Sequence, residues 1–337
     1  MIDLRRLQVL RAVAHHGSVT AAAASLHLTP SAASQQIRHL ARELQVALLE
    51  PAGRGVRLTG AARRLLGHAD AIEERWQRAE ADLADPSPTG ELRICGLPTT
   101  ISALLAPAVA RLRERSPALV VRLREAEPPE CFDLLFSGAA DLVVTMATPG
   151  GPSAADTRFD LCPLLDDPYD LLTSPGHPLA RRTGVALADL AAEPWIVGMP
   201  GTFYRDLVLA LAAGAGFTPS VAHEVLEWTA VAALAGQGLG VSLVPRIVRL
   251  PDEPAVVRTE LADAPARRLV TVVRRGNREA PAIAAALSAL SAEIGEMGRD
   301  PGAERARRMS GDPFDGVGEQ RRDADGERAR VEQRGVR

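Results

Sequence analysis

Short polar side chains and arginines occur at helical spacing between residues 29 and 44, where they could read a nucleic acid. Ser31, Ser34 and Gln35 are candidates for base edges, because serine allows a close approach and glutamine can form two hydrogen bonds to adenine. Arg38 and Arg42 are candidates for phosphates or the minor groove, since guanidinium groups are common donors to phosphate oxygens. The pattern predicts a DNA-reading surface.

A helix from Pro30 to Leu44 must carry these side chains. Thr29 is a good N-cap, and Pro30 suits the first helical position, where the N–H that proline lacks would have no intrahelical partner. The opposite face is apolar at spacings of four, three and four residues, with Ala33, Ile37, Leu40 and Leu44. We expect this stripe to pack on a core and to leave the polar, basic face exposed.

A shorter helix is expected just upstream, with Ser18 as its cap and Ser25 as its last residue. His27 and Leu28 would form the turn between the two helices. Such a pair is typical of the helix-turn-helix, which lays its second helix in the major groove, so Ser18, Thr29 and Pro30 join the candidate DNA contacts. The alternative is an ordinary small helical domain, where alanine-rich and polar helix faces are also common.

Two flanking segments complete this predicted head. Leu4 to Val13 fits a first helix that packs beneath the pair. Residues 45 to 59 are typical of two short strands around a glycine-containing turn, with Arg54 at its tip. An arginine on such a hairpin could reach a phosphate or enter the minor groove.

Residues 60 to 85 carry an unbroken heptad pattern. Apolar residues alternate at spacings of four and three along one seam, which comprises Leu65, Ala69, Ile72, Trp76, Ala79 and Leu83. We expect a helix that dimerises and thereby presents two recognition helices to two half-sites. The alternative is an amphipathic helix that packs on its own domain. A linker-like segment, Asp85 to Gly90, follows.

From Gly90 onward, strand-like and helix-like segments alternate, which favours a mostly parallel α/β sheet and two lobes with a cleft between them. Two helix starts, Thr99-Thr100 and Gly201-Thr202, could hold an anion across the cleft, although threonine also caps helices without any ligand. Apolar walls and a facing carboxylate complete the candidate effector site, for which we name Thr99, Thr100, Ile101, Glu127, Met199, Gly201, Thr202 and Phe203.

Charge and composition narrow the functional classes. Residues 1 to 66 contain nine Arg against three Asp and Glu, a net +6, while the whole chain of 337 residues carries −3. A basic head on an acidic body fits a nucleic-acid-binding module joined to a part that does not contact phosphate. The chain contains no Lys, which removes Schiff-base chemistry and the P-loop lysine, and only His177 and His223 follow residue 70. These features argue against an enzyme.

Cysteines and hydropathy point to a cytoplasmic protein without metal or cofactor. Cys95, Cys131 and Cys162 are odd in number, widely spaced and lack a CxxC pair, so we interpret them as small buried hydrophobes, with a redox-sensing pair as the less favoured alternative. There is no secretory signal pattern and no apolar run of membrane-spanning length. We expect no membrane partner.

The chain resembles the LysR-type transcriptional regulators over Met1 to Ile294. The features that carry the resemblance, in chain order, are the spaced apolar residues Leu4, Leu7, Leu10 and Val13, followed by Gly17 to Ala23, Leu28 to Ser34, Arg54 to Gly60, Ala140 to Val143, Gly176 to Leu179 and Ala235 to Val241. The resemblance implies an α/β protein with an all-α winged helix-turn-helix head and a two-lobed effector domain like a periplasmic binding protein. The chain departs from the family pattern at Leu49, usually Phe, at Pro51, often Arg, and at Glu127-Pro128-Pro129, where many members have Ser or Thr.

Together these observations predict four regions. They are a winged head over 1–59, a dimerisation helix over 60–89, an effector domain over 90–297 and a disordered tail over 298–337. Lobe I comprises 90–163 and 266–297, and lobe II comprises 164–265. We expect a transcriptional regulator that binds double-stranded DNA as a homodimer or homotetramer and responds to a small-molecule effector, either a carboxylate or an amino acid. The alternative function is a two-lobed α/β enzyme with a DNA-binding head.

Overall fold

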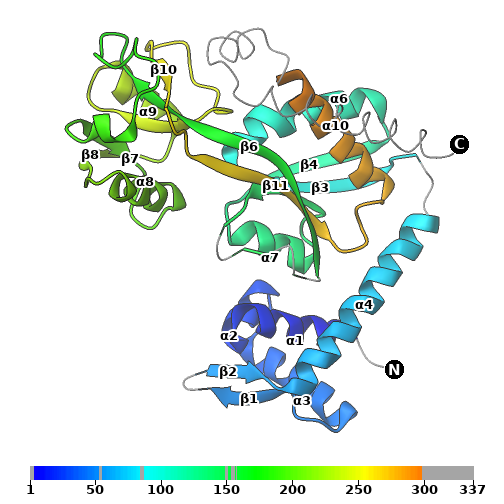
Figure 1. The fold of residues 1–337 in the computed structure, drawn as a ribbon. Helices are drawn as coiled ribbons and strands as arrows, with labels where there is room; N and C mark the ends of the chain where they lie inside the picture. The colour runs from blue at the N-terminus through cyan, green and yellow to red at the C-terminus, as the bar shows by residue number, and fades with distance from the viewer. Residues whose placement is uncertain are drawn as a thin grey trace, which may run out of the picture. The chain divides into compact units, whose positions relative to one another are not determined.

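A computed structural model describes residues 4–52, 55–83, 87–148, 151–152, 156 and 158–297. Arg54 and the predicted tail lie outside the described residues. The head contains helices α1 (Leu4–His16), α2 (Val19–Ser25) and α3 (Pro30–Leu44), as the sequence predicts (Figure 1). Their buried core includes Leu10, Ala22, Ala33, Ile37 and Leu40, so the apolar stripe of α3 faces inward.

A two-stranded wing follows α3. Strands β1 (Leu49–Ala52) and β2 (Gly55–Leu58) are antiparallel, and Leu49 lies opposite Leu58. The polypeptide leaves α3 through Gln45, whose φ of 54° is in the left-handed region. Glutamine adopts this conformation only rarely, and it ends the helix by turning the chain toward the wing.

The predicted heptad seam lies on helix α4 (Gly60–Leu83), and its two ends differ in burial. In the first turns of the helix the seam residue Ala69 is buried in the core of the head and the seam residue Leu65 packs against that core, together with Ala62 and Leu66, which lie off the predicted seam. Further along, Ile72 and Trp76 are 58% and 62% exposed. The amphipathic pattern therefore serves the head's own core at one end of the helix and an exposed apolar surface at the other.

Lobe I is built on three parallel strands in the order β5-β3-β4, with bounds β3 (Gly90–Gly96), β4 (Leu119–Glu125) and β5 (Leu142–Met146). One helical stretch joins β3 to β4 and consists of α5 (Pro98–Thr100), a π-helical segment η1 (Ile101–Leu105) and α6 (Ala106–Arg115). Helix α7 (Glu130–Ser137) lies on the opposite face of the sheet from α6 (Figure 1). Helix α10 (Pro281–Met297) contributes the buried residues Ile283, Ala286 and Leu290.

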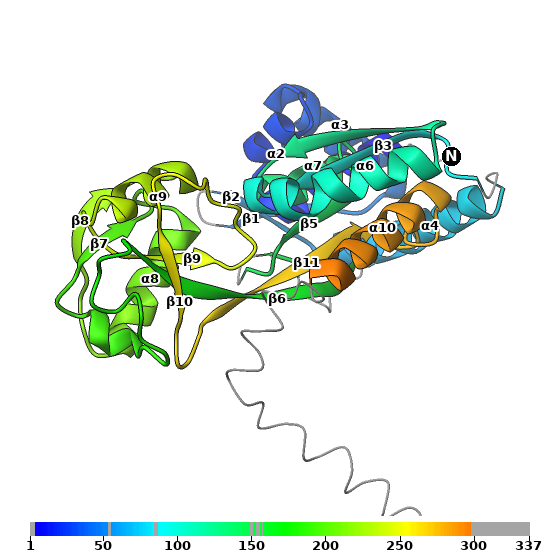
Figure 2. The same cartoon turned by 90° about the horizontal axis from the view of Figure 1, so that it is seen from above.

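Two long strands connect the lobes. Strand β6 (Phe159–Thr173) pairs antiparallel with β11 (Ala266–Arg274), and the two strands run side by side between the lobes (Figure 2). The seven-stranded sheet is therefore mixed, whereas the sequence predicts a mostly parallel one. Strand β6 is not predicted from the sequence because Pro163, Pro168 and four aspartates lower its strand propensity. The bulge between Leu269 and Val270 accommodates this irregular sequence.

Lobe II contains the parallel pair β7 (Pro194–Val197) and β8 (Ser220–Glu224). Helices α8 (Phe203–Gly214) and α9 (Trp228–Gly236) begin shortly after these strands, and the short helix η2 (Leu187–Leu190) precedes β7. Strands β9 (Ser242–Pro245) and β10 (Val257–Glu260) pair with the lobe II half of β6. No helix among the described residues is long and apolar enough to cross a membrane.

Candidate functional site

The exposed face of α3 carries the predicted DNA-reading side chains. Ser31, Gln35, Arg38 and Arg42 are all exposed and recur at spacings of four, three and four residues, so they form one stripe along the helix. Ser34 beside them is half-buried. Within the described part of the chain, neither Arg38 nor Arg42 takes part in an ion pair, in contrast to the nearby Arg6–Glu43 pair at 2.6 Å. The two guanidinium groups are thus available to a phosphate.

Side-chain caps satisfy backbone N–H groups at the start of both helices of the helix-turn-helix. The Thr29 hydroxyl accepts a hydrogen bond from the Ala32 N–H at 3.2 Å, and the Ser18 hydroxyl accepts one from the Ala21 N–H at 3.4 Å. His27 turns the chain between the helices with a φ of 54°. Ser18 and Thr29 therefore have a structural role as caps, and their contact with DNA stays a prediction.

A cavity of about 300 Å³ separates α3 from the wing. Its lining includes Ser34 and Arg38 on α3 together with Leu49 and Val56 on the two strands. Leu49, where the resemblance implies a bulkier phenylalanine, thus borders this hollow.

A second cavity, of about 280 Å³, lies at the carboxyl ends of strands from both lobes. From lobe I the lining includes Leu97, Pro98 and Thr99 after β3, Glu125 and Glu127 at the end of β4, and Met146 of β5. From lobe II it includes Gly198, Thr202, Phe203, Tyr204, Glu227 and Trp228. The lining also includes Tyr169 of β6, Arg267 of β11, and Val225 and Leu226 between β8 and α9. This is the place where open α/β sheets bind ligands. We call it the interlobe pocket.

A buried ion pair lies at this pocket. The Arg267 Nε donates to Asp167 Oδ2 at 2.9 Å, and its Nη2 donates to the Thr99 hydroxyl at 3.0 Å. Burial raises the pKa of Asp167, although the positive charge of Arg267 and the Ile247 N–H act in the opposite direction. The positive charge of Arg267 is therefore balanced within the protein.

The threonine hydroxyls that were predicted to bind an anion form hydrogen bonds within the protein. Thr202 lines the pocket, but its hydroxyl donates to the Met199 carbonyl at 2.7 Å and accepts from the Arg205 N–H at 3.4 Å, as a helix cap does. Thr100 is fully buried, and its hydroxyl bonds the carbonyls of Leu97 and Val144. Thr99, Glu127, Thr202 and Phe203 thus converge on the pocket, whereas its lining does not include Thr100, Ile101, Met199 or Gly201.

Several lining residues were missed by the sequence analysis. Tyr204 and Trp228 form an edge-to-face aromatic pair with ring centroids 5.0 Å apart, and the Tyr204 hydroxyl donates to the Leu243 carbonyl at 2.6 Å. Glu125, Glu227 and Arg267 were not singled out either. A usable signal exists for Glu227 and Trp228, because they follow a predicted strand and begin a predicted helix, where ligand-facing residues gather.

Two of the three cysteines are buried in lobe I. Cys95 is on β3 and Cys131 is on α7, and both side chains are inaccessible. Burial raises the pKa of Cys95 to about 12 and that of Cys131 to about 11. At neutral pH these thiols are protonated and therefore weakly reactive, which fits the interpretation of small buried hydrophobes.

Comparison with known proteins agrees with this architecture. The "RuBisCO operon transcriptional regulator" of Allochromatium vinosum is 29% identical over 301 residues, 88% of this chain and 98% of its own length. A "Hydrogen peroxide-inducible genes activator" of Escherichia coli is 29% identical over 253 residues, covering 74% and 81% of the two chains. The structure of HinK, a LysR family transcriptional regulator from Pseudomonas aeruginosa, superposes with a TM-score of 0.55 at 22% identity and covers 88% of this chain and all of that one.

Family profiles match both parts of the molecule. Residues 4–63 match the profile described as "Bacterial regulatory helix-turn-helix protein, lysR family". Residues 86–294 match the "LysR substrate binding domain", which is more than half of the chain. The head with its helix-turn-helix and the two-lobed α/β part that holds the interlobe pocket therefore each match a domain of one family, and the chain belongs to the LysR family of bacterial transcriptional regulators.

Proposed function

We propose that this regulator reads its promoter with the α3 face and that a small molecule in the interlobe pocket modulates the binding. The observation that carries the proposal is the stripe of Ser31, Gln35, Arg38 and Arg42, which is exposed along the full length of a helix capped by Thr29. In this proposal Gln35 and the serines contact base edges, and the two arginines contact phosphates. Arg54 stays a predicted contact of the wing.

Self-association through α4 would double this surface. Ile72 is 58% exposed on the predicted seam and is an unfavourable residue to leave in water. A second copy of α4 is the partner that the heptad pattern favours, and the resulting dimer would place two α3 helices on two half-sites. In the same proposal, two such dimers could join to form the predicted homotetramer. The molecule would act in the cytoplasm, where it meets promoter DNA.

The effector would act through the two strands that join the lobes. The pocket is lined from both lobes, so a ligand that contacts Glu127 on one side and Phe203 on the other stabilises one interlobe arrangement over others. Because β6 and β11 continue through both lobes, this arrangement could alter the oligomer and the spacing of the heads. Of the two predicted effector classes, a carboxylate and an amino acid, the presence of Glu127 in the lining supports a molecule with an amino group.

Peroxide sensing is a second candidate, because one relative is named as a hydrogen peroxide-inducible activator. Thiol-based sensing needs accessible cysteines with thiolate character. Cys95 and Cys131 are buried, with pKa values raised to about 12 and about 11. Their surroundings favour a small-molecule effector over a sensor built on this pair.

Salt-dependent promoter binding tests the proposal. Arg38→Ala should weaken binding to specific and random DNA alike, and it should flatten the slope of log affinity against log salt by about one. Arg113→Ala is the matched control, because Arg113 is an exposed arginine of α6 whose removal changes the net charge equally. An unchanged slope for Arg38→Ala would refute the phosphate role. Footprints with and without candidate metabolites would test the effector part.

A further inference from the structure

The interlobe pocket is acidic once its internal ion pair is taken into account. Three exposed glutamates line it, Glu125 and Glu127 from lobe I and Glu227 from lobe II. Arg267 also lines the pocket and carries a positive charge. Asp167 neutralises this charge, because its Oδ2 lies 2.9 Å from the Arg267 Nε, and the arginine side chain is only 8% exposed. A ligand that enters therefore meets a net charge of about −3 from these groups, which attracts cations and repels anions.

The hydrogen-bonding groups of the pocket point to the same preference. The Thr202 hydroxyl already donates to the Met199 carbonyl, and the Tyr204 hydroxyl already donates to the Leu243 carbonyl. Two donors of Arg267 are engaged by Asp167 and Thr99. The three glutamate carboxylates, in contrast, can only accept when ionised. The pocket thus offers many hydrogen-bond acceptors to a ligand, while several of its donors are already hydrogen-bonded to other groups of the protein.

An aromatic wall stands beside the acidic rim. Trp228 immediately follows Glu227 at the start of α9, and Tyr204 packs edge-to-face against it at 5.0 Å. Phe203 lines the same pocket. Aromatic faces attract ammonium and guanidinium groups through the ring quadrupole, so the wall and the rim favour the same kind of ligand.

We propose that the effector of this regulator is a small organic cation, with one or two ammonium groups held between Glu125, Glu127, Glu227 and the face of Trp228. The inference rests on the proposed role of the pocket as the effector site and narrows its ligand to amines whose net charge is positive. The volume of about 280 Å³ limits the ligand to a small metabolite. The same charges disfavour simple carboxylates.

Four-carbon compounds that differ in charge test this inference on the full-length protein. The probes are 1,4-diaminobutane with two ammonium groups, 4-aminobutanoate with one of each charge, and succinate with two carboxylates. Titration calorimetry and thermal unfolding would be measured at constant ionic strength, which removes general salt effects. We expect 1,4-diaminobutane to bind with millimolar or better affinity and to raise Tm, 4-aminobutanoate to bind more weakly, and succinate to have no effect.

Charge-neutral variants locate the binding to the pocket. The triple substitution Glu125→Gln, Glu127→Gln and Glu227→Gln should weaken binding of 1,4-diaminobutane by about tenfold or more, since each exposed contact contributes only modestly. A matched triple variant changes the same charge outside the pocket, at Glu91, Glu114 and Glu130, each to Gln. This control should bind the diamine as the wild type does. Trp228→Leu should weaken binding while retaining all three carboxylates.

The outcomes separate the inference from the proposed function. Binding of succinate without binding of the diamine would overturn the cationic class and leave the pocket as the effector site. Equal loss of diamine affinity in the pocket and control triples would also overturn it, because the attraction would then be general. If none of the three probes binds or raises Tm, the assignment of an amine ligand is overturned as well. Promoter affinity and its salt slope, measured on the same preparations, report independently on the DNA-binding role.

Discussion

Arg267 and Asp167 form a buried ion pair between neighbouring strands at the point where the two lobes join. Arg267 is on β11 and Asp167 is on β6, and the two residues are register partners in the antiparallel ladder. The same guanidinium reaches the Thr99 hydroxyl at the start of the lobe I helix. One side chain thus fixes a lobe I helix start to the strands that continue into lobe II, and it does so beside the effector pocket.

Removal of the arginine alone should destabilise the protein strongly. Arg267→Met leaves the Asp167 carboxylate buried with backbone N–H groups as its neighbours, among them that of Ile247 at 3.1 Å, and without a countercharge from Arg267. An uncompensated buried charge costs about 3 kcal/mol or more of unfolding free energy. Urea unfolding measures the loss. The double variant Arg267→Met with Asp167→Asn should recover part of it at neutral pH, and no recovery would show that the arginine acts through packing instead.

The same pair gives a signed dependence on pH. Burial raises the pKa of Asp167 above its ordinary value, with Arg267 opposing the shift. Between the unfolded and the folded pKa the native state holds more protons, so the free energy of unfolding falls as pH rises through that window. Because the charge of Arg267 lowers the pKa of Asp167, removal of this arginine raises the folded-state pKa further and extends this pH window upward. As the pH rises above the ordinary carboxyl pKa of about 4, Arg267→Met should therefore lose more stability than the wild type, and parallel pH curves would contradict this account.

The buried cysteines should be silent toward thiol reagents in the native protein. With pKa values of about 12 and about 11, Cys95 and Cys131 hold roughly a thousandth or less of their thiols as thiolate near pH 8. An aromatic disulfide reagent should therefore find at most Cys162 in the native state and all three cysteines in urea. The rate at the two buried sites should rise with pH toward their pKa. Rapid reaction of either one near neutrality would reopen the peroxide-sensing alternative.

The sequence predicts the head almost completely because local signals determine it. Thr29, Pro30 and the stripe that includes Ile37 specify where α3 begins and which face it buries, and the structure confirms both. The short lobe strands were also predicted close to their bounds, as for the strand Leu119–Glu125. These elements follow from the periodicity and capping of neighbouring residues, without reference to distant parts of the chain.

The pocket was predicted only in part because distant pairings build it. Arg267 and Thr99 are 168 residues apart, and no local pattern joins them. Strand β6 was missed because its prolines and aspartates obscure a strand that the sheet stabilises from both sides. The commitment of the Thr202 hydroxyl to a carbonyl could not be predicted either, since threonine at a helix start looks the same whether it caps the helix or binds an anion.

Filling the hollow beneath the wing should stabilise the head. Leu49→Phe places a ring in the cavity of about 300 Å³ between α3 and the wing, and cavity-filling substitutions contribute about 1 kcal/mol. Hydrogen exchange of the α3 and wing amides in the full chain would measure the gain as slower exchange. Val56→Ala enlarges the same hollow and should accelerate exchange. Faster exchange in Leu49→Phe would mean that the ring overpacks the site.

Gln35 should contribute to discrimination between DNA sequences, whereas Arg38 should contribute to affinity for any DNA. Gln35→Ala removes a candidate bidentate contact to adenine and should reduce discrimination at one base pair by about 1 to 3 kcal/mol, with little effect on random DNA. Competition binding against promoter variants, one base pair changed at a time, would measure this. The salt slope should stay at the wild-type value. A uniform loss across all promoter variants would assign Gln35 to the backbone.

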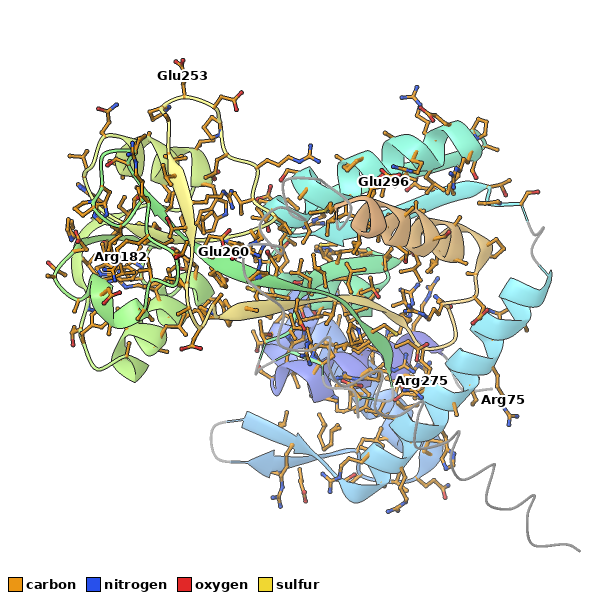
Figure 3. All side chains as sticks on the ribbon, turned by 45° about the horizontal axis from the view of Figure 1, so that its top comes forward. Arg75, Arg182, Glu253, Glu260, Arg275 and Glu296 are labelled. Atoms are coloured by element: carbon orange, nitrogen blue, oxygen red, sulfur yellow. The ribbon has the colours of Figure 1, made fainter. Side chains whose placement is uncertain are left out.

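Disruption of the exposed seam of α4 should separate the two heads. Ile72→Glu introduces a charge at a position that the proposed dimer buries, so sedimentation velocity should show a smaller species. Arg75→Gln is the matched control, because it changes the charge by the same amount and Arg75 lies off the seam and projects from the same helix (Figure 3). Loss of the second head also removes its effective concentration on the DNA, which lowers affinity for a two-half-site promoter by about a hundredfold or more. A species of wild-type size in the Ile72→Glu protein would place the dimer interface elsewhere.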